Sequence, residues 1–440
     1  MAKSTAFFNV EIKSKEIIKP SSPTPLALRT LQLSLLDQVS PQIYTPLILF
    51  YTPTPNGDSP IDSHQTSNIL RSSFSQALTH FYPLAGRIKD FESIECNDSG
   101  ADSVEAHVNC PLAHLLQKPD VEILRKLLPL DTRPPVGAGG CLLSVQANFF
   151  ECGGLAIGAC FSHRIADAFT FISFMKSWAD INAGVPCSLV CLKFSAASSI
   201  FPPVKPLPEL ITPRVWSNDA AVRRIVFRGP KIAELRAKAA SESVPQPSRI
   251  EAVTALIWKC AMAASRSNHG FSRPSTLSHV VNLRKRIALP SSPENSMGNI
   301  YSLFFAETDD SEKELPVLVG LLRRSQEKLR EKLTELERAD ASSWVVEIKE
   351  KMKGLRREKD VDLYIFSSWC KFPMYEADFK WGKPTWVTYT PPLVKNSIFL
   401  LDTREGDGIE AWIPLSKQDM AFFESDENLL AFASLDPSAL

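Results

Sequence analysis

The sequence carries no excess of charge of either sign. Its 440 residues include 49 lysines and arginines and 49 aspartates and glutamates, so the formal net charge is zero. Proteins that bind nucleic acid or membrane surfaces through their overall charge need a surplus of basic residues. We therefore expect no nucleic acid and no membrane partner, although a local basic group can still hold an anionic ligand.

Close cysteine pairs are also missing. The nine cysteines are odd in number and show no C-x-x-C spacing, and no histidine cluster accompanies the nearest pair, Cys187 and Cys191. Disulfide frameworks and zinc sites need cysteines at short, regular spacings. The pattern predicts buried thiols in a reducing compartment, by default the cytosol, and no metal site.

No stretch is apolar enough to predict a membrane span or a signal-peptide core. The most apolar long window, residues 141–163, is interrupted by Gln146, Asn148, Glu151 and glycines, whereas a transmembrane helix needs about 20 predominantly apolar residues. With 44% apolar and 22% charged residues, the composition is that of a soluble globular protein.

The length predicts two domains, because one hydrophobic core rarely serves more than about 250–300 residues. Residues 186–213 contain six prolines and no helical period, which indicates a stiff interdomain crossover. We expect an N-terminal domain at residues 1–200, a proline-rich linker at 201–215 and a C-terminal domain at 216–440.

Hydrophobic periodicity predicts alternating strands and helices in both halves. Ser248 and Glu251 form a capping-box pattern that should begin a helix. The expected strands are 46–51, 142–150, 155–161, 224–227 and 278–283, and the expected helices are 69–81, 167–178, 231–241, the helix after Ser248, and charge-rich helices within 310–358.

His163 lies where a catalytic side chain is expected. Gly153 and Gly154 predict a turn, residues 155–161 read as a buried strand, and a helix should begin beside Asp167. His163 would therefore sit at a strand-to-helix corner. A neutral imidazole can take a proton from a hydroxyl and return it near physiological pH. His163 is thus a candidate general base, with a purely structural histidine as the alternative.

Several other catalytic patterns are missing. The chain has no G-x-S-x-G elbow, which argues against a serine hydrolase. The glycine-rich residues 137–140 lack both phosphate-loop spacings and predict a plain loop. A metal-dependent hydrolase built on His163 and Asp167 would lack a third ligand.

Two spaced motifs carry a resemblance to a known family. His163-x-x-x-Asp167 and the later segment Asp378-Phe379-Lys380-Trp381-Gly382 resemble the two signatures of the plant BAHD acyltransferases, and the chain is most similar to their vinorine synthase-like branch, which acetylates alkaloids and terpenoids. Further matches are 18–25 (IKPSSPTP), 35–38 (LLDQ), 82–87 (YPLAGR), 96–98 (CND), 282–284 (NLR), 298–299 (GN) and 408–412 (GIEAW).

The resemblance implies two chloramphenicol acetyltransferase-like α/β domains with mixed sheets and a solvent channel at their interface. It implies an acyl-CoA-dependent O-acyltransferase without a permanently bound cofactor and without an acyl-enzyme, in which His163 is the general base. Acetyl-CoA is the expected co-substrate, and a hydroxyl of an alkaloid or terpenoid is the expected acceptor. The chain is expected to act as a monomer, since no large apolar stripe suggests obligate assembly.

The resemblance also assigns roles to other residues. Asp167 is expected to pair with Arg284 of the second domain and hold the corner, rather than to orient His163. Ser367 and Trp369 match positions that line the catalytic centre, where a hydroxyl and an indole N–H can donate to an oxyanion. A core aromatic is the alternative for Trp369.

Asp378, Trp381 and Gly382 are expected to shape the fold. Lys380 replaces a glycine of the family pattern, so either the backbone is ordinary there or a positive φ strains the lysine by about 1 kcal/mol. The ordinary backbone is the simpler expectation.

The phosphates of coenzyme A suit basic side chains. The candidates are Arg249, Arg284 and Lys285, each of which can instead be a surface or structural cation. Two rival functions stay open: aroyl or hydroxycinnamoyl transfer to a phenolic or amine acceptor, and a catalytically silent family member that binds metabolites.

Overall fold

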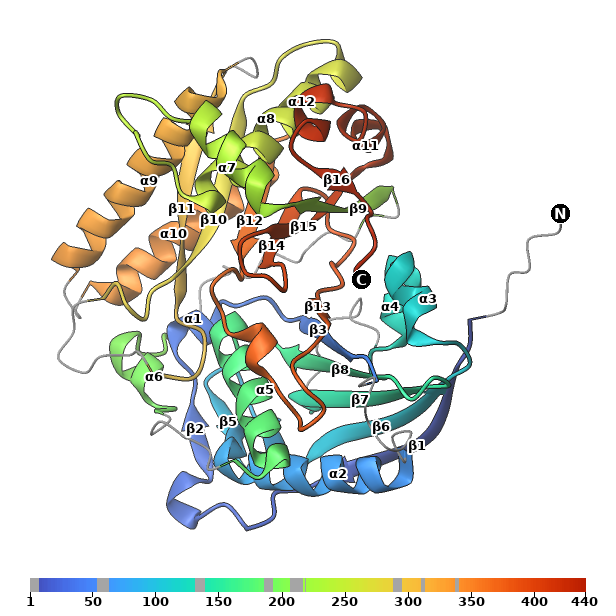
Figure 1. The fold of residues 1–440 in the computed structure, drawn as a ribbon. Coiled ribbons are helices and arrows are strands. Elements are labelled where there is room, and N and C mark those ends of the chain that lie inside the picture. Colours follow the sequence, from blue (N-terminus) through green and yellow to red (C-terminus); the bar gives the residue numbers. More distant parts are fainter. Residues whose placement is uncertain are drawn as a thin grey trace, which may run out of the picture.

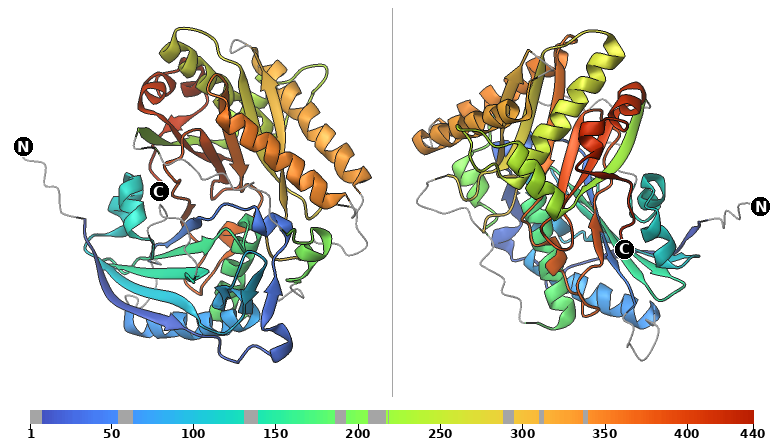
Figure 2. Two further views of the ribbon diagram at one scale, coloured as in Figure 1. Left: turned by 180° about the vertical axis from the view of Figure 1, so that it is seen from behind. Right: turned by 45° about the horizontal axis from the view of Figure 1, so that its top comes forward.

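The computed structural model describes residues 8–53, 63–130, 139–185, 193–205, 217, 219–287, 295–309, 313–336 and 340–440. The chain folds into two sheet-rich halves that meet along one interface, as Figures 1 and 2 show from three directions. Residues 206–216 lie outside the described part, so the linker at 201–215 and the domain limits drawn from it stay predictions.

The first sheet belongs mainly to the N-terminal half and has six strands. Strands β6 and β7 run parallel and all other neighbours run antiparallel. In spatial order the strands are β1 (Val10–Ile18), β6 (Ala101–Val108), β7 (Leu143–Phe150), β8 (Leu155–Ser162), β3 (Tyr44–Tyr51) and β13 (Trp386–Thr388).

The second sheet has seven strands and is also mixed, because β12 runs parallel to both of its neighbours. In spatial order it contains β11 (Tyr301–Thr308), β10 (Ser275–Asn282), β12 (Asp362–Ser368), β14 (Ser397–Asp402), β15 (Ile409–Ser416), β9 (Ala220–Phe227) and β16 (Ser434–Leu435). A small third sheet joins β2 (Thr30–Gln32), β5 (Ser93–Glu95) and β4 (Arg87–Ile88). The expected α/β fold with mixed sheets is confirmed.

Helices pack against both large sheets (Figure 1). In the first half they are α1 (Leu35–Gln38), α2 (Ser63–His80), α3 (Leu112–Gln117), α4 (Val121–Lys126), α5 (Ala168–Ala183) and α6 (Ala196–Ile200). In the second half they are α7 (Gly229–Lys238), α8 (Arg249–His269), α9 (Leu315–Glu335), α10 (Ala341–Arg357), α11 (Lys417–Phe423) and α12 (Glu427–Leu430). Three 3₁₀ turns are Leu26–Leu28, Tyr82–Ala85 and Met374–Glu376. None of the described helices is long and apolar enough to cross a bilayer.

The predicted elements are all present, but some boundaries differ by up to six residues, most at the start of α2 and the end of α5. The hairpin of β7 and β8 is antiparallel as expected, and the Ser248–Glu251 capping box is present at the start of α8. The two charge-rich helices are α9 and α10. All seven described cysteines are free thiols, whereas Cys187 and Cys191 lie outside the described residues.

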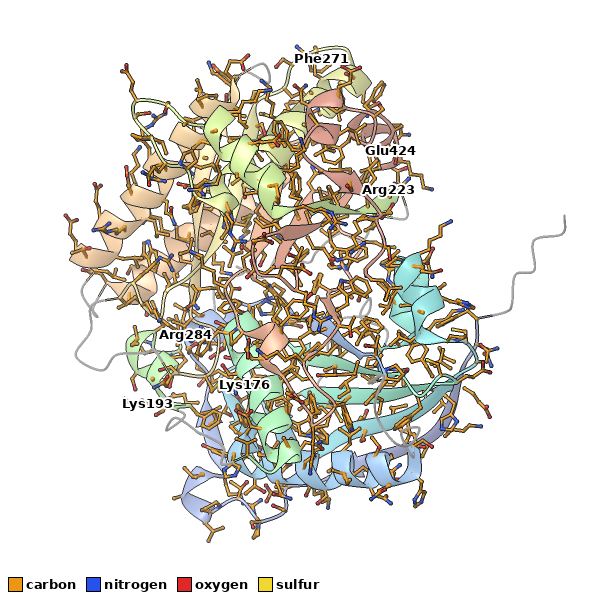
Figure 3. All side chains as sticks on the ribbon, in the orientation of Figure 1. Lys176, Lys193, Arg223, Phe271, Arg284 and Glu424 are labelled. Carbon is orange, nitrogen blue, oxygen red and sulfur yellow. The ribbon has the colours of Figure 1, made fainter. Side chains whose placement is uncertain are left out.

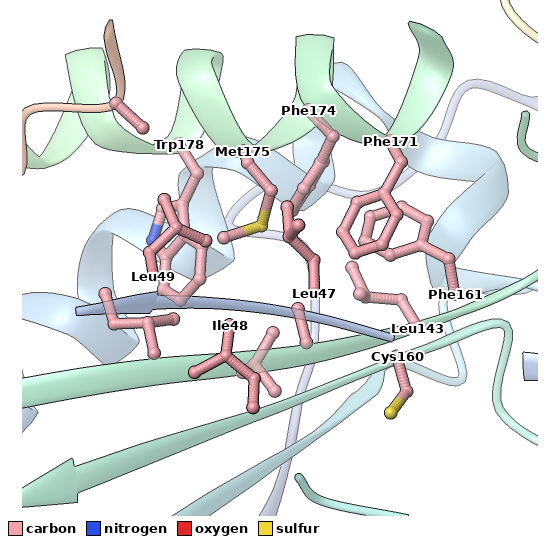
Figure 4. Close-up of a cluster of buried hydrophobic side chains, with 14 of the residues drawn as sticks. Leu47, Ile48, Leu49, Leu143, Cys160, Phe161, Phe171, Phe174, Met175 and Trp178 are labelled. Atoms are coloured by element: carbon pink, nitrogen blue, oxygen red, sulfur yellow. The ribbon is translucent and has the colours of Figure 1, made fainter. Parts of the chain in front are cut away.

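Helix α5 is fixed to the first sheet by large apolar side chains. Phe171, Phe174 and Trp178 follow helical spacing and are each at most 2% exposed, and Figure 4 shows them directed at the strands below. The rings of Phe171 and Phe161 lie 4.0 Å apart. Burying each such side chain contributes about 1.5–3 kcal/mol. The end of β8 and the start of α5 therefore form a rigid corner.

Strand β13 comes from the second half of the sequence but completes the first sheet, where it pairs with β3. Glu410, 3% exposed, holds it from the second sheet: its carboxylate accepts hydrogen bonds from Trp386 Nε1 at 3.0 Å and from Thr388 Oγ1 at 2.9 Å. Arg224 Nε donates to the same carboxylate at 2.8 Å. The GIEAW segment thus connects the two halves.

His279 is buried within the second sheet. Its ring stacks between Phe304 and Phe366, with ring centres 5.3 and 6.2 Å away, and its Nδ1–H donates to the Val280 carbonyl at 2.9 Å. Burial lowers the pKa of His279 from 6.5 to about 4, aided by the nearby Arg286 charge. The folded protein therefore disfavours the protonated imidazole, which the unfolded chain accepts.

This shift predicts that stability is full above about pH 6.5 and falls by about 3 kcal/mol as the pH drops towards 4, because only the unfolded chain takes up the proton in that range. His279→Leu should flatten this slope in urea unfolding measured at pH 7.5, 6, 5 and 4.5. His114→Leu, at an exposed helix position, is the control and should leave the slope as it is. An unchanged slope in His279→Leu would contradict the prediction.

Candidate active site

A cavity at the interface of the two halves contains His163. It encloses about 1100 Å³, part of it open to solvent, and both halves contribute to its wall. The first half supplies Pro41, Ile43, Thr45, His163, Asp167, Ala168 and Phe169; the second supplies residues of β10, β11, α10, β12 and β14, with Trp369, Phe372 and Tyr389. The structure therefore brings together the three predicted catalytic residues, His163, Ser367 and Trp369, at one cavity.

His163 directly follows β8 and is half-buried, so its ring can reach a ligand. Its backbone is held on both sides: the amide donates to the Ile43 carbonyl at 2.9 Å, and the carbonyl accepts from Asn299 Nδ2 at 2.8 Å. The ring lies 5.9 Å from the ring of Tyr301. The corner is thus supported by both halves of the protein.

Asp167 caps α5 and binds Arg284 across the interface. Arg284 donates to both carboxylate oxygens, at 2.7 and 3.1 Å, and the amides of Thr170 and Ile300 donate to them at 3.0 Å each. A carboxylate offers about four lone-pair sites. These four donors use the carboxylate fully, so the geometry favours a structural role over orientation of His163.

Both partners of this ion pair are buried, Arg284 at 2% exposure and Asp167 at 8%. Burial alone would raise the pKa of Asp167, but the Arg284 charge and the hydrogen bonds outweigh it and hold this pKa below its ordinary 3.8. The stabilisation from the pair is therefore present above pH 4 and is lost only as the pH falls through that lowered pKa. Figure 3 shows Arg284 where the two halves meet.

Arg284 has further partners that fix its position. Its Nε donates to the Ser296 carbonyl and one terminal nitrogen to the Gly298 carbonyl, both at 2.9 Å. Its guanidinium also lies 4.3 Å from the ring centre of Phe169, which lines the cavity. The side chain is therefore fully used inside the protein, which weighs against contact with a coenzyme phosphate.

A second buried carboxylate, Asp37, supports the same corner from the other side. Asn299 donates to Asp37 Oδ1 through its amide and its side chain, both at 2.8 Å, and Ser34 donates to Oδ2. Burial raises the pKa of Asp37 despite these donors. The LLDQ and GN segments are thus joined directly behind His163. Sequence reasoning noted both segments but assigned them no role.

Ser367 and Trp369 lie at the end of β12, in the part of the cavity wall that the second half supplies. Trp369 is 5% exposed, and its ring packs against Tyr389 at 5.3 Å and Phe171 at 6.3 Å. Trp369 is therefore both a core aromatic and a cavity residue, so the two interpretations offered for it from the sequence are compatible.

The segment Asp378–Gly382 lies outside the cavity wall. Asp378 Oδ1 accepts from the amides of Lys380 and Gly382 at 2.8 and 3.0 Å, and Phe379 packs on Trp178 of α5 with ring centres 5.0 Å apart. Phe379 also stacks on Trp381. The turn thus anchors the far end of α5 and contributes no group to the reacting centre.

The expectation of an ordinary backbone at Lys380 is wrong. Lys380 has φ of +75°, and Gly382 has +88°. The Asp378 carboxylate accepts hydrogen bonds from two amides of this tight turn, and the turn has a left-handed backbone at position 380. The lysine therefore carries the strain that the family glycine avoids.

The remaining basic candidates lie apart from the cavity wall. Arg249 donates to the Gly406 carbonyl at 2.7 Å and to Asp402 at 3.2 Å, so it secures the β14–β15 hairpin. Lys285 is exposed beside Arg284. No group of three or more His, Cys, Asp or Glu side chains in the described part of the chain is arranged to hold a metal ion.

Comparison with known proteins decides the family. The Transferase family model matches residues 8–430. The chain is a BAHD acyltransferase. It is 39% identical to akuammiline synthase 1 of Alstonia scholaris over 430 residues, 96% of this chain and 97% of that protein. It is 39% identical to vinorine synthase of Rauvolfia serpentina over 424 residues, 94% of this chain and 95% of that protein.

The crystal structure of vinorine synthase superimposes with a TM-score of 0.86 at 36% identity, covering 98% of this chain and all of that one. Relatives and fold together show that the chain is an acyl-CoA-dependent O-acyltransferase of the vinorine synthase-like branch. The family and branch inferred from the two motifs are confirmed.

The interface ion pair generates a stability prediction. Arg284→Gln should lower the free energy of unfolding by about 3–5 kcal/mol, because it leaves Asp167 buried without its main partner. Asp167→Asn combined with Arg284→Gln should cost less than the sum of the two single changes. Arg223→Gln is the control: Arg223 pairs with Glu424 at 2.7 Å, but both are about one-third exposed, so about 0–1 kcal/mol is expected. Urea unfolding measures all four variants, and equal costs for Arg284→Gln and Arg223→Gln would contradict the prediction.

The strained turn at Asp378–Gly382 leads to a second stability prediction. Lys380→Gly should raise the free energy of unfolding by about 0.5–1 kcal/mol, since relief of the left-handed strain exceeds the extra entropy of glycine in the unfolded chain. Lys383→Gly, three residues on and outside the positive-φ set, should instead lower it by a similar amount. Differential scanning fluorimetry of both variants checks the opposite signs.

Proposed function

We propose that this acyltransferase moves an acetyl group from acetyl-CoA to a hydroxyl of an alkaloid or terpenoid, with His163 as the general base. The observation that carries the proposal is the position of His163: it lies half-buried in a cavity between the two halves, and Ser367 and Trp369 line the same cavity. The relatives named above support the substrate class.

In the proposed reaction, both substrates bind before any bond changes. The neutral His163 ring accepts the proton of the acceptor hydroxyl as its oxygen attacks the thioester carbonyl carbon. The carbonyl oxygen becomes an oxyanion, and the donors proposed for it are the Ser367 hydroxyl and the Trp369 indole N–H, both from residues that line the cavity. The intermediate then releases the coenzyme A thiolate, which takes the proton back from His163.

Asp167 and Arg284 act as positioning residues in this proposal. Their ion pair holds the backbone after His163 at the interface, and the Asn299 hydrogen bond holds the His163 carbonyl. Asp378, Trp381 and Gly382 fix the distal end of α5. We assign none of the candidates Arg249, Arg284 and Lys285 to coenzyme phosphate. The side chains of Arg249 and Arg284 bind groups within the protein, and Lys285 is the most exposed of the three. We also propose, from the composition of the sequence, that the enzyme acts as a monomer in the cytosol.

The first test is coenzyme A thiol release from acetyl-CoA against a panel of alkaloid, terpenoid and phenolic alcohols. Wild type should give acceptor-dependent release, and His163→Ala should reduce it by about 10²-fold or more. Release that survives the substitution would overturn the general-base role. Preference for an aroyl-CoA donor would favour the aromatic acyltransferase, and silence with every donor would favour a metabolite-binding member that has lost catalysis.

A further inference from the structure

Two hydroxyl groups in the cavity wall have no hydrogen-bond partner among the residues that the structure describes. Thr45 Oγ1 and Ser397 Oγ are buried, in residues that are 7% and 2% exposed, and both residues line the cavity that contains His163. A buried polar group without a partner disfavours folding, and such groups are uncommon in folded proteins. Each of them therefore calls for an explanation.

Their places in the two sheets put each hydroxyl beside a group of the proposed mechanism. Thr45 lies on β3, two residues after Ile43, whose carbonyl accepts the His163 amide at 2.9 Å. Alternate residues of a strand share one face, and Ile43 and Thr45 both line the cavity. Thr45 therefore lies next to His163 on the wall of the first half.

Ser397 occupies the corresponding place in the other half. It lies opposite Ile365 in the parallel pair β12–β14, while Ser367 lies opposite Phe399. All four residues line the cavity, so Ser397 and Ser367 are neighbours on one face of the second sheet. The cavity thus has one unpartnered hydroxyl beside the proposed base and one beside a proposed oxyanion donor.

Packing alone does not require either hydroxyl. Valine has the shape of threonine without its polar atom, and alanine differs from serine only by the hydroxyl, so both would fill these positions without a desolvation cost. A ligand in the cavity that offers oxygen atoms would remove the cost by completing the missing hydrogen bonds.

We propose that Thr45 and Ser397 are substrate-binding residues of this enzyme. Thr45 Oγ1–H donates to the acceptor hydroxyl oxygen, which places its proton towards His163 and favours the loss of that proton. Ser397 Oγ–H donates to the thioester carbonyl oxygen beside Ser367. The assignment rests on the acetyl transfer proposed above and adds an acceptor contact and a third carbonyl contact to it.

The Thr45 contact is tested by steady-state kinetics with acetyl-CoA and the most active alcohol of the panel, or with water as acceptor in the slow hydrolysis of acetyl-CoA. Thr45→Val should lower kcat/KM for the acceptor by about tenfold, and Thr45→Ser, which keeps the hydroxyl, should stay within about threefold of wild type. Thr254→Val is the matched control, because Thr254 Oγ1 is also buried and without a partner among the described residues but lies in α8, away from the cavity wall.

The Ser397 contact is tested in the same assay. Ser397→Ala should lower kcat by about tenfold with every acceptor, because a carbonyl contact strengthens as the oxyanion forms. Ser144→Ala removes a buried, unpartnered hydroxyl from β7 and should leave kcat unchanged. All four hydroxyl-removing variants should raise the melting temperature, which separates lost binding from lost folding.

The outcomes distinguish this proposal from the one it rests on. If Thr45→Val and Ser397→Ala behave like their controls while His163→Ala is inactive, the base assignment stands and the two hydroxyls are not substrate contacts. If His163→Ala keeps its activity, acetyl transfer by the proposed mechanism fails first. A tenfold loss in Thr45→Ser equal to that in Thr45→Val would show that shape rather than the hydroxyl matters and would overturn the Thr45 assignment.

Discussion

The ion pair between Asp167 and Arg284 is the interaction on which the rest of the site depends. It joins the first turn of α5, in one half, to the segment after β10, in the other, directly behind the residue that faces the cavity. Because the carboxylate also accepts two backbone amides, the pair fixes the helix end and the interface together. Asp37 and Asn299 repeat this arrangement on the other side of His163.

Burying two charges is costly, and well-packed apolar residues can be as stabilising as a buried ion pair. The pair adds a geometric constraint. A guanidinium and a carboxylate that meet through two hydrogen bonds restrict the relative placement of the two halves. An apolar contact of the same area would tolerate sliding. A reaction that needs a base in one half and hydrogen-bond donors in the other requires such a fixed placement.

Much of this arrangement could be predicted from the sequence, and the reasons are local. The hairpin before His163 and the helix after it follow from glycines and apolar spacing within thirty or so neighbouring residues. The Asp167–Arg284 pair was expected only through the family resemblance, because no periodicity links residues so far apart. Thr45, Tyr301, Tyr389 and Ser397 were missed: each lies in a strand or beside one, and only the assembled sheets direct it to the cavity. The backbone conformation at Lys380 was predicted wrongly because the sequence does not reveal the two hydrogen bonds that Asp378 accepts from backbone amides of its own turn.

The late origin of β13 has a consequence for how the protein is made. Trp386 stacks on Phe50 with ring centres 5.1 Å apart, yet it lies far later in the chain. During synthesis from the N-terminus, β3 can pair with β8 early, but its other edge has no native partner until most of the chain has left the ribosome. An unpaired, apolar strand edge is a template for association with other chains. The nascent N-terminal half therefore passes through a period in which it is open to aggregation, and that period ends only when β13, close to the end of the sequence, has been synthesised.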